Sequence, residues 1–465
     1  DMESGGVQMT WLESDLSSAE TTQLIAVATD TLVAATSNGA SEIVLIMVGD
    51  KPEDKYAVTS GSIFKFSSLD GSKVLEVALP TEDFNIHSCC NPASISWDTA
   101  HSGTIGVQLG RTMTRGSDGL NHQGGFAFVL DPSTLEVVFN YGQTAGHSFG
   151  SSVIPSVFGS FLGMDLGDNY PRGVQMYRFN GSEKSIQHRV VYAFKTKHAT
   201  NGCHGNDDPP VYDEISTAET TFYKCSNDNY VYTELAHPGL VETGDDGILV
   251  FFAGEKPPLD NAKVGAALNS ARNIGFVKVP RDLQSTEVLS PGPEELGGFY
   301  NFGGGWSEQR NVGVSFITSQ TEIDQSVSRL KTAHLESGQV LLLFEIWSGE
   351  KYNRTEYLLV DEDGAIQVPQ APLGYDIQFP FAEDPVVRNG RVVMYTGTTQ
   401  GQLVRYELCA TGTCPGPATT TTTSMAADPE EESSSLEEEI PSTSAASSSA
   451  ILSFLTFPLL AGISN

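Results

Sequence analysis

The sequence predicts an all-β protein, and three observations lead to this expectation. Gly accounts for 46 of the 465 residues while only 18% are charged, a bias opposite to that of helix-rich and coiled-coil proteins. Short apolar and β-branched runs alternate with turn residues, and helical periodicity is not sustained over three turns, which indicates strands. A hairpin pattern also recurs along the chain, which favours a repeat architecture.

Each expected strand is a short run bounded by Gly, Asp, Asn or Pro. The clearest runs are Leu24–Ala35, Glu42–Val48, Thr104–Leu109, Phe126–Val129, Val190–Phe194, Ile248–Phe252, Val312–Ile317, Val340–Ile346, Tyr357–Val360 and Arg391–Tyr395. No stretch between them resembles a linker, and the one strong change in composition follows Cys414. We therefore expect a short N-terminal segment at 1–21 and a single large β domain at 22–415.

The repeat is a hairpin whose turn carries an aspartate able to hydrogen-bond its own backbone. Its four copies are Ser62–Val77, Gly125–Val138, Ile274–Leu289 and Thr355–Val368, with turn residues Asp70, Asp131, Asp282 and Asp361. Spacings between these aspartates suit units of about 55 residues if several copies have drifted or carry insertions. The prediction is a β-propeller of seven four-stranded blades.

Two other all-β folds stay open, because paired β-sandwiches and a long jelly roll contain similar hairpins. A propeller has to close its ring. We expect an N-terminal strand at Leu24–Ala28 to complete the blade that ends at Val404–Leu408.

The charge excludes one class of partner. The formal net charge is −32, and a field of that sign repels nucleic-acid backbones and anionic lipid headgroups. Seven acidic and no basic residues fall at 416–465, so −25 stays on residues 1–415. Acidity is therefore a property of the expected domain, and nucleic acid is not expected as a partner.

The C-terminal tail has the composition of a disordered stalk at 416–449, rich in Thr, Ser and Glu, which cannot bury enough apolar surface to fold. The apolar segment at 450–465 is too short for a good transmembrane helix. Small residues, a polar spacer and a short apolar end are the order of a GPI attachment signal. Attachment is expected among Ser433–Ser435, or alternatively at Ser442–Ala446; the other interpretation is a weakly hydrophobic disordered end.

Cysteine usage points to an oxidising compartment, because an even set of thiols can pair completely. The chain starts at Asp1, which suits removal of a signal peptide or a fragment. We expect a protein that is extracellular, at the cell surface or secreted, with a membrane contact only through the lipid anchor. The expected disulfides are Cys203–Cys225 and Cys409–Cys414, with Cys89 and Cys90 as an adjacent pair or linked elsewhere, and the glycosylation acceptors are Asn180 and Asn353.

The densest polar stretch lies at 146–173 and is the first candidate binding site. His147, Asp168 and Arg172 are expected near strand ends, where the loops of a propeller converge and bind polar ligands. Asp165 and Asp168 also offer oxygens to Ca²⁺, although the spacing differs from that of an EF-hand. The alternative is a structural turn in which Arg172 pairs with a carboxylate.

Two motifs in this stretch, His-Ser-Phe-Gly at 147–150 and Gly-Asp-Asn-Tyr-Pro-Arg-Gly at 167–173, carry a resemblance. They resemble motifs of uncharacterised secreted or lipoprotein β-propellers of bacteria. The hairpin at 355–368 and the segment at 384–393 are similar to later blades of those proteins. The resemblance spans about residues 85–408 and implies a propeller fold, without an established reaction.

Two further groups of residues are candidate ligand sites. In the loop at 197–210, His204 and Asp207 suit a divalent transition metal, although a disulfide-pinned surface loop is the favoured interpretation. Trp306, Trp347 and Tyr352 lie where loops are expected. They could stack on sugar rings, or alternatively pack in a blade core.

The predicted function is therefore a binding or scaffold module for glycan or protein ligands. The alternative is a secreted hydrolase or lyase that uses a His/Asp/Arg centre or a divalent metal, with Ca²⁺ as one candidate cofactor. A nucleophile elbow is not supported, because Gly146–Gly150 lacks the strand-turn-helix setting that such a serine requires.

Overall fold

The computed structural model describes residues 7–12, 19–25, 30–49, 60–80, 93–112, 123–144, 148–158, 160–167, 173–180, 185–193, 214–216, 221–223, 233–256, 271–283, 289, 292–302, 305–349, 351–373, 377–379, 383–388, 390–397, 402–409 and 423–424. These residues form strands and turns, with a short 3₁₀ helix at Ile323–Gln325. No helix within them is long and apolar enough to cross a membrane.

Four four-stranded sheets and one eight-stranded sheet, which divides between β17 and β23 into two groups of four, carry the fold in this part of the chain. We call these six groups blades 1 to 6 in chain order. Blades 1 to 3 are β3 (Asp30–Ser37), β4 (Glu42–Gly49), β5 (Gly61–Ser67) and β6 (Lys73–Ala78); β7 (Ser94–Trp97), β8 (Ile105–Thr112), β9 (Gln123–Leu130) and β10 (Val137–Gln143); and β11 (Ser148–Ser156), β12 (Ser160–Gly167), β13 (Gly173–Asn180) and β14 (Ser185–Ala193).

The second half of the chain supplies the other three blades. They are β17 (Glu234–Glu242), β18 (Gly247–Glu255), β19 (Arg272–Pro280) and β22 (Ser315–Phe316); β23 (Ser326–His334), β24 (Gln339–Ser348), β25 (Lys351–Asp361) and β26 (Ile366–Pro372); and β27 (Val386–Arg388), β28 (Arg391–Gly397), β29 (Gln402–Cys409) and β30 (Thr423–Ser424). Three hairpins stand apart: β1 (Val7–Leu12) with β2 (Ala19–Ile25), β15 (Glu214–Ser216) with β16 (Thr221–Tyr223), and β20 (Gly292–Phe302) with β21 (Gly305–Gly313).

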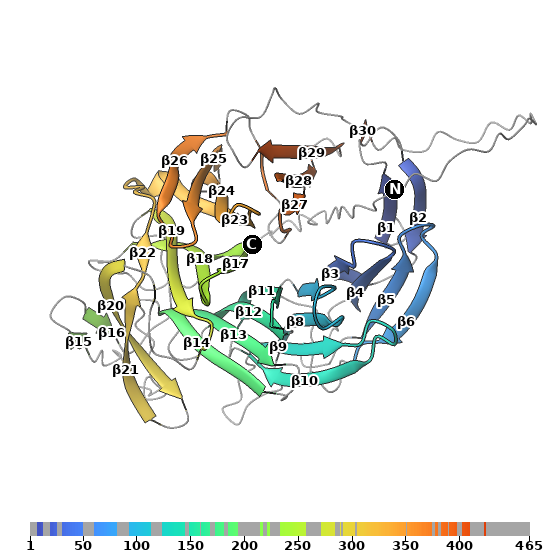
Figure 1. Cartoon of the computed structure of the whole chain (residues 1–465), viewed down its shortest axis with the longest axis horizontal. Helices are drawn as coiled ribbons and strands as arrows, with labels where there is room; N and C mark the ends of the chain where they lie inside the picture. Colours follow the sequence, from blue (N-terminus) through green and yellow to red (C-terminus); the bar gives the residue numbers. More distant parts are fainter. Residues whose placement is uncertain are drawn as a thin grey trace, which may run out of the picture.

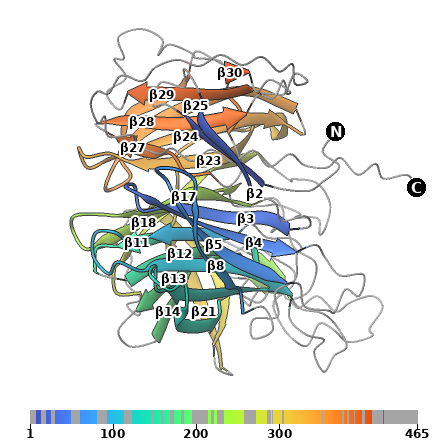
Figure 2. The same ribbon diagram turned by 90° about the vertical axis from the view of Figure 1, so that its right-hand side faces the viewer.

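The blades are arranged radially, so the protein is a β-propeller, as predicted. Figure 1 shows the blades following one another around a ring, with first strands such as β11, β17 and β23 towards its centre. The first strands of successive blades are neighbours: β3 and β7, β7 and β11, β11 and β17, β17 and β23, and β23 and β27. In the side view of Figure 2, strands run through the thickness of the ring.

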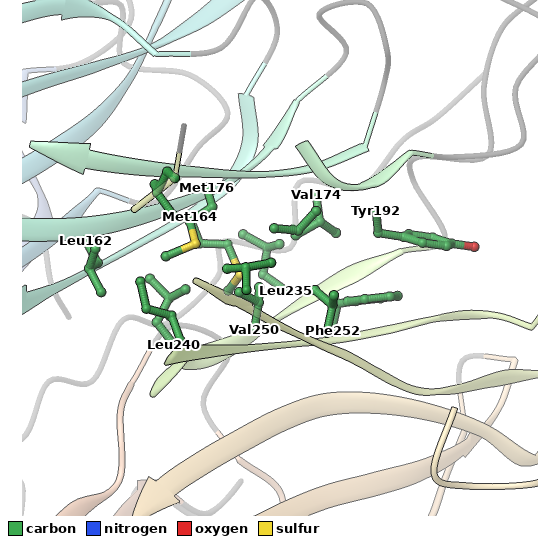
Figure 3. Close-up of a cluster of buried hydrophobic side chains, with 14 of the residues drawn as sticks. Leu162, Met164, Val174, Met176, Tyr192, Leu235, Leu240, Val250 and Phe252 are labelled. Atoms are coloured by element: carbon green, nitrogen blue, oxygen red, sulfur yellow. The ribbon is translucent and has the colours of Figure 1, made fainter. Parts of the chain in front are cut away.

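The core is divided into layers between successive blades. Blades 3 and 4 enclose a layer that includes Met164, Val250 and Phe252 (Figure 3). Strand β18 is buried along its whole length because it serves two layers. Its residues Val250 and Phe252 face blade 3, whereas Leu249 and Phe251 face blade 5. A strand buried on both faces reads as a continuous apolar run, which explains why the sequence identifies this one clearly.

The ring has two different ends. Strands β17 and β23 are parallel, and β11 runs the same way because Ser152 bonds to Pro238 and Ser156 to Glu242. We call the turn end the side where first strands lead into second strands, as at 157–158, 243–246 and 335–338. The loop end is the opposite side, where first strands begin and where β24 ends beside Gly349.

The predicted turn aspartates are largely confirmed. Asp70 accepts a hydrogen bond from the Ser72 amide at 3.0 Å, and Asp131 accepts one from the Ser133 amide at 2.7 Å. Asp361 accepts from the amides of Asp363 and Ala365 at 3.0 and 2.9 Å. In each case the carboxylate closes the turn between the third and fourth strands of a blade.

Basic side chains at the turn end connect one blade to the next. Lys65, Arg178 and Lys278 each lie two residues before the end of a third strand. Lys65 Nζ donates to the Pro132 carbonyl at 2.9 Å, and Arg178 Nη1 to the Arg281 carbonyl at 3.4 Å. Lys278, whose side chain is 2% exposed, pairs with Asp245 and with Asp363 of the next blade, both at 2.7 Å.

The predicted ring closure is wrong within the described residues. Leu24 and Ile25 belong to β2, which pairs with β1, whereas β29 pairs with β28 and with β30. Strand β30 falls inside the segment expected as a disordered stalk, so Thr423 and Ser424 add to blade 6; the rest of that segment and the GPI candidate lie outside the described residues. The number of seven blades stays a prediction.

Candidate functional site

The structure describes only some of the residues that the sequence predicts as site residues. Outside the described residues lie His147, Asp168, Arg172, His204, Asp207, Cys89, Cys90, Cys203, Cys225 and Cys414. Trp306 lies in β21, Asn180 ends β13 and Cys409 ends β29, with only their backbone described. Asn353 lies in β25 and donates from Nδ2 to the Asp324 carbonyl at 3.4 Å. The binding, metal, disulfide and glycosylation predictions for these residues stay predictions.

Asp165 is described, and it lies between blades rather than at the surface. It is fully buried on β12. Its Oδ2 accepts hydrogen bonds from Gln108 Nε2 at 2.8 Å and from Thr144 Oγ1 at 3.2 Å, both from blade 2. A buried carboxylate needs such donors, and these bonds join blades 2 and 3 through Asp165; its predicted role as a metal ligand stays a prediction. No group of three or more His, Cys, Asp or Glu residues suited to a metal occurs among the residues that the structure describes.

A second set of described residues meets at the loop end, and its first member is Arg329. Strand β23 contains a bulge between Ser328 and Lys331, and Arg329 has a φ of 49°, a left-handed conformation that costs energy for a non-glycine residue. Glu234 Oε2 accepts from the Arg329 amide at 2.9 Å, while Arg272 pairs with Glu234 Oε1 at 2.9 Å. Bulges redirect side chains, and this one directs Arg329 out of the ladder.

Trp347 is the residue that Arg329 approaches. The guanidinium carbon of Arg329 lies 5.1 Å from the centre of the Trp347 ring, within cation–π distance. The β24–β25 ladder shifts register at Trp347, and Tyr352 lies edge-on to the indole with centroids 6.1 Å apart. Trp347 remains partly exposed, so the indole is fixed from several sides and still reaches solvent.

Glu345 is the buried carboxylate that contacts both Trp347 and Arg329. Its side chain is fully buried, and Trp347 Nε1 donates to its Oε2 at 2.6 Å. The Phe379 amide donates to Oε1, and Arg329 Nε lies 3.9 Å from Oε2. Burial raises the pKa of Glu345, although the hydrogen bond from Phe379 and the charge of Arg329 act in the opposite direction. We call Glu234, Arg329, Glu345, Trp347 and Tyr352 the loop-end site.

Lys331 and two carboxyl groups lie next to the loop-end site. Lys331 is fully buried, and its Nζ donates to the Glu383 carbonyl at 2.5 Å. Burial lowers the pKa of Lys331 to about 8 and raises the pKa of Glu383 to about 7. Burial also raises the pKa of Asp384 to about 6, although Asp384 is exposed to solvent.

This arrangement combines an aromatic face, a guanidinium and carboxylates, a set that suits a polar ligand with an apolar face. Trp347 and Tyr352 were among the aromatic candidates in the sequence, although they were expected in loops and lie in strands β24 and β25. The sequence did not identify Arg329, Glu234 or Glu345. Glu345, for example, reads only as an interruption of the apolar run Val340–Ile346. That interruption, a charge inside a strand with buried neighbours, is the signal that could have identified it.

No family model and no curated protein matches the sequence. Solved structures show a low similarity to the chain. An α-L-arabinanase of Penicillium chrysogenum is 12% identical over 71% of this chain and 80% of its own, with a TM-score of 0.38. An ulvan lyase is 10% identical over 87% and 82% with a TM-score of 0.45. The β-propeller domain of the Trilobed protease of Pyrococcus furiosus is 10% identical over 82% and 97% with a TM-score of 0.34. Similarities this low do not bear on activity or ligand.

Proposed function

We propose that the protein is an extracellular, cell-surface binding module that recognises glycans at the loop-end site. The observation that carries this proposal is the fixed, partly exposed indole of Trp347, which donates to buried Glu345 at 2.6 Å and lies 5.1 Å from the Arg329 guanidinium. Sugar rings present C–H groups on one face and hydroxyl groups at their edges. An aromatic face beside charged hydrogen-bonding groups matches both.

Rigidity is the second point in favour of binding. Arg329 is held by Glu234 through its amide and by the Phe379 carbonyl through Nη1, at 2.9 and 2.7 Å. Trp347 is held by Glu345 and Tyr352. A site whose side chains are already in place loses little conformational entropy when it binds. The strained backbone at Arg329 fits the same interpretation, because such strain gathers at ligand sites.

The proposal includes display of the protein at the cell surface, and the support for this part comes from the sequence. Its supports are the even cysteine set, the acidic domain and the order of segments at 416–465. Treatment of intact cells with a phosphatidylinositol-specific phospholipase should release the protein. A protein that stays on the membrane, or was never there, would contradict the lipid anchor.

A hydrolase or lyase is the second candidate, and one observation favours it. The pKa of Glu383 is raised to about 7, in the range that suits a general acid or base near neutral pH. Glycans that bind should then be cleaved by the wild type and left intact by Glu383→Gln. If the protein binds glycans and does not cleave them, the result supports a binding module and contradicts a hydrolase or lyase.

The full chain on a glycan array tests the proposal. We expect a restricted set of glycans to bind, and Trp347→Ala to lose them while its circular dichroism stays unchanged. Phe158→Ala is the matched control, because Phe158 is also an exposed aromatic near arginines but lies at the turn end. Binding that survives Trp347→Ala, or the absence of any bound glycan, would overturn the proposal.

A further inference from the structure

The turn end carries an exposed apolar pair that the glycan proposal does not use. Val157 and Phe158 form the turn between β11 and β12 and are 52% and 54% exposed. Side chains in such short turns are usually polar, so two adjacent large apolar residues need an explanation. They project from the face opposite the loop-end site.

The pair is held rigidly despite its exposure. Glu242 of blade 4 accepts from Ser156 Oγ at 2.7 Å and from the Val157 amide at 2.8 Å. The Phe158 amide points to Ser156 Oγ at 3.4 Å. A turn fixed to the neighbouring blade presents its side chains in one arrangement, and this lowers the entropy lost when a partner binds.

Two guanidinium groups flank the Phe158 ring. The guanidinium carbon of Arg281 lies 4.2 Å from the ring centre and that of Arg178 lies 5.8 Å away. Arg281 is neutralised by Asp246 and by Glu242. Arg178 differs, because its partners within the described chain are the Arg281 carbonyl and the Phe158 ring, and no carboxylate pairs with it there.

We propose that Val157, Phe158 and Arg178 form a docking surface for a protein partner, through a segment that carries an apolar side chain beside a carboxylate. The apolar side chain would cover the Phe158 ring and Val157. The carboxylate would take paired hydrogen bonds from the Arg178 guanidinium, whose planar geometry fits it. Aromatic and arginine residues dominate the energetics of protein interfaces.

Charge decides the class of occupant. Arg178 has no carboxylate partner within the described residues, so it favours a ligand group that carries a negative charge. A lipid surface fits less well, because a membrane would bring a broad anionic face against a chain of net charge −32, whereas a short segment needs to place only one carboxylate beside Arg178. A peptide segment supplies both an apolar and an anionic group within reach of one side chain.

The test uses the full chain and short fluorescent peptides in which Asp or Glu flanks Leu or Phe, with fluorescence anisotropy as the readout. We expect binding that weakens with salt, disappears when the peptide carboxylates become amides, and falls about tenfold in Phe158→Ala and in Arg178→Gln. Leu69→Ala, another exposed apolar residue in a turn, and Lys351→Gln at the loop end are the controls and should bind as the wild type does.

Other outcomes separate the occupants. Absence of peptide binding overturns the proposal, as does binding that Phe158→Ala and Arg178→Gln leave unchanged. Dimerisation in light scattering that these variants abolish would assign the surface to a second copy of the chain, and attachment to anionic vesicles would assign it to a membrane; either result contradicts a protein segment. Glycan binding should be unaffected in Phe158→Ala, so this proposal and the proposed function fail independently.

Discussion

The turn end and the loop end of the ring are built on different principles. At the turn end, local aspartates close the turns, and basic side chains such as Lys278 connect one blade to the next. At the loop end, bulges in β23 and between β24 and β25 direct Arg329 and Trp347 towards each other. The turn end therefore holds neighbouring blades together. The loop end instead contains a strained backbone at Arg329, which places the side chains of a preorganised site.

The largest effect is expected from Glu345→Ala at the loop end. This change leaves the Phe379 amide and the Trp347 indole N–H without their acceptor and removes the carboxylate that lies beside the Arg329 guanidinium. Unsatisfied buried donors are costly, so the free energy of unfolding should fall by about 3 kcal/mol. Urea unfolding followed by circular dichroism measures it. A loss smaller than that from Lys278→Met would show that the loop-end site does not depend on Glu345.

Lys278→Met at the turn end should have an intermediate effect of about 1–2 kcal/mol. The buried stem is preserved, and only the ion pairs with Asp245 and Asp363 disappear; these carboxylates are 59% and 73% exposed, which weakens the pairs. Burial acts to lower the pKa of Lys278, but hydrogen bonds to both aspartates raise it overall. The hydrogen bond from Lys278 lowers the pKa of Asp245.

The pKa shifts of Lys278 and Asp245 determine how the stability contributed by their ion pair depends on pH. A raised lysine pKa gives stability that is present below about pH 10, and a lowered aspartate pKa gives stability that is lost in acid below about pH 4. The difference between the wild type and Lys278→Met should therefore be constant near neutral pH and shrink in acid. A difference that grows in acid would contradict the ion pairs.

Near the loop end, a lower pH should increase the free energy of unfolding through protonation of Glu383. The pKa of Glu383 is raised to about 7 by burial, so the folded state gains stability as the pH falls from about 7 towards 4.5. Glu383→Gln imitates the protonated form. It should be more stable than the wild type at about pH 8, by about 1 kcal/mol after allowance for partial exposure and for Lys331, and equal to it at about pH 4. Equal stability at both pH values would show that Glu383 is solvated.

The smallest effect is expected for Lys73→Ala on the outer strand of blade 1. Lys73 and Glu76 are 2.6 Å apart but 51% and 44% exposed, so solvent screens the pair. The free energy of unfolding should change by less than about 0.5 kcal/mol. A loss similar to that of Lys278→Met would mean that burial of the stem does not distinguish the two lysines.

The fold could be predicted because its signals are local. The run Ile248–Phe252 is apolar throughout since β18 is buried on both faces, and Asp131 closes its turn with residues only two and three positions away. Ring closure could not be predicted in this way. The partner of β29 depends on which segment reaches its edge, which no local pattern shows; β30 pairs there, whereas Leu24 and Ile25 belong to β2 and pair with β1.

The loop-end site could be predicted only in part for the same reason. Trp347 and Tyr352 are neighbours in sequence and were identified as a pair, but Arg329 meets them through register shifts that no local pattern encodes. Asp165 shows the converse. It was expected near a ligand site from its local sequence, and the structure shows that Gln108, distant in sequence, donates a hydrogen bond to it between two blades; binding of Ca²⁺ by Asp165 stays a prediction.

Hydrogen–deuterium exchange of the full chain, with and without a glycan found on the array, tests the central claim most directly. The loop-end site predicts slower exchange on binding at residues 326–334 and 345–356, with no change at 155–158 and 281–283. Protection confined to the turn end, or to strand β12 around Asp165, would contradict it.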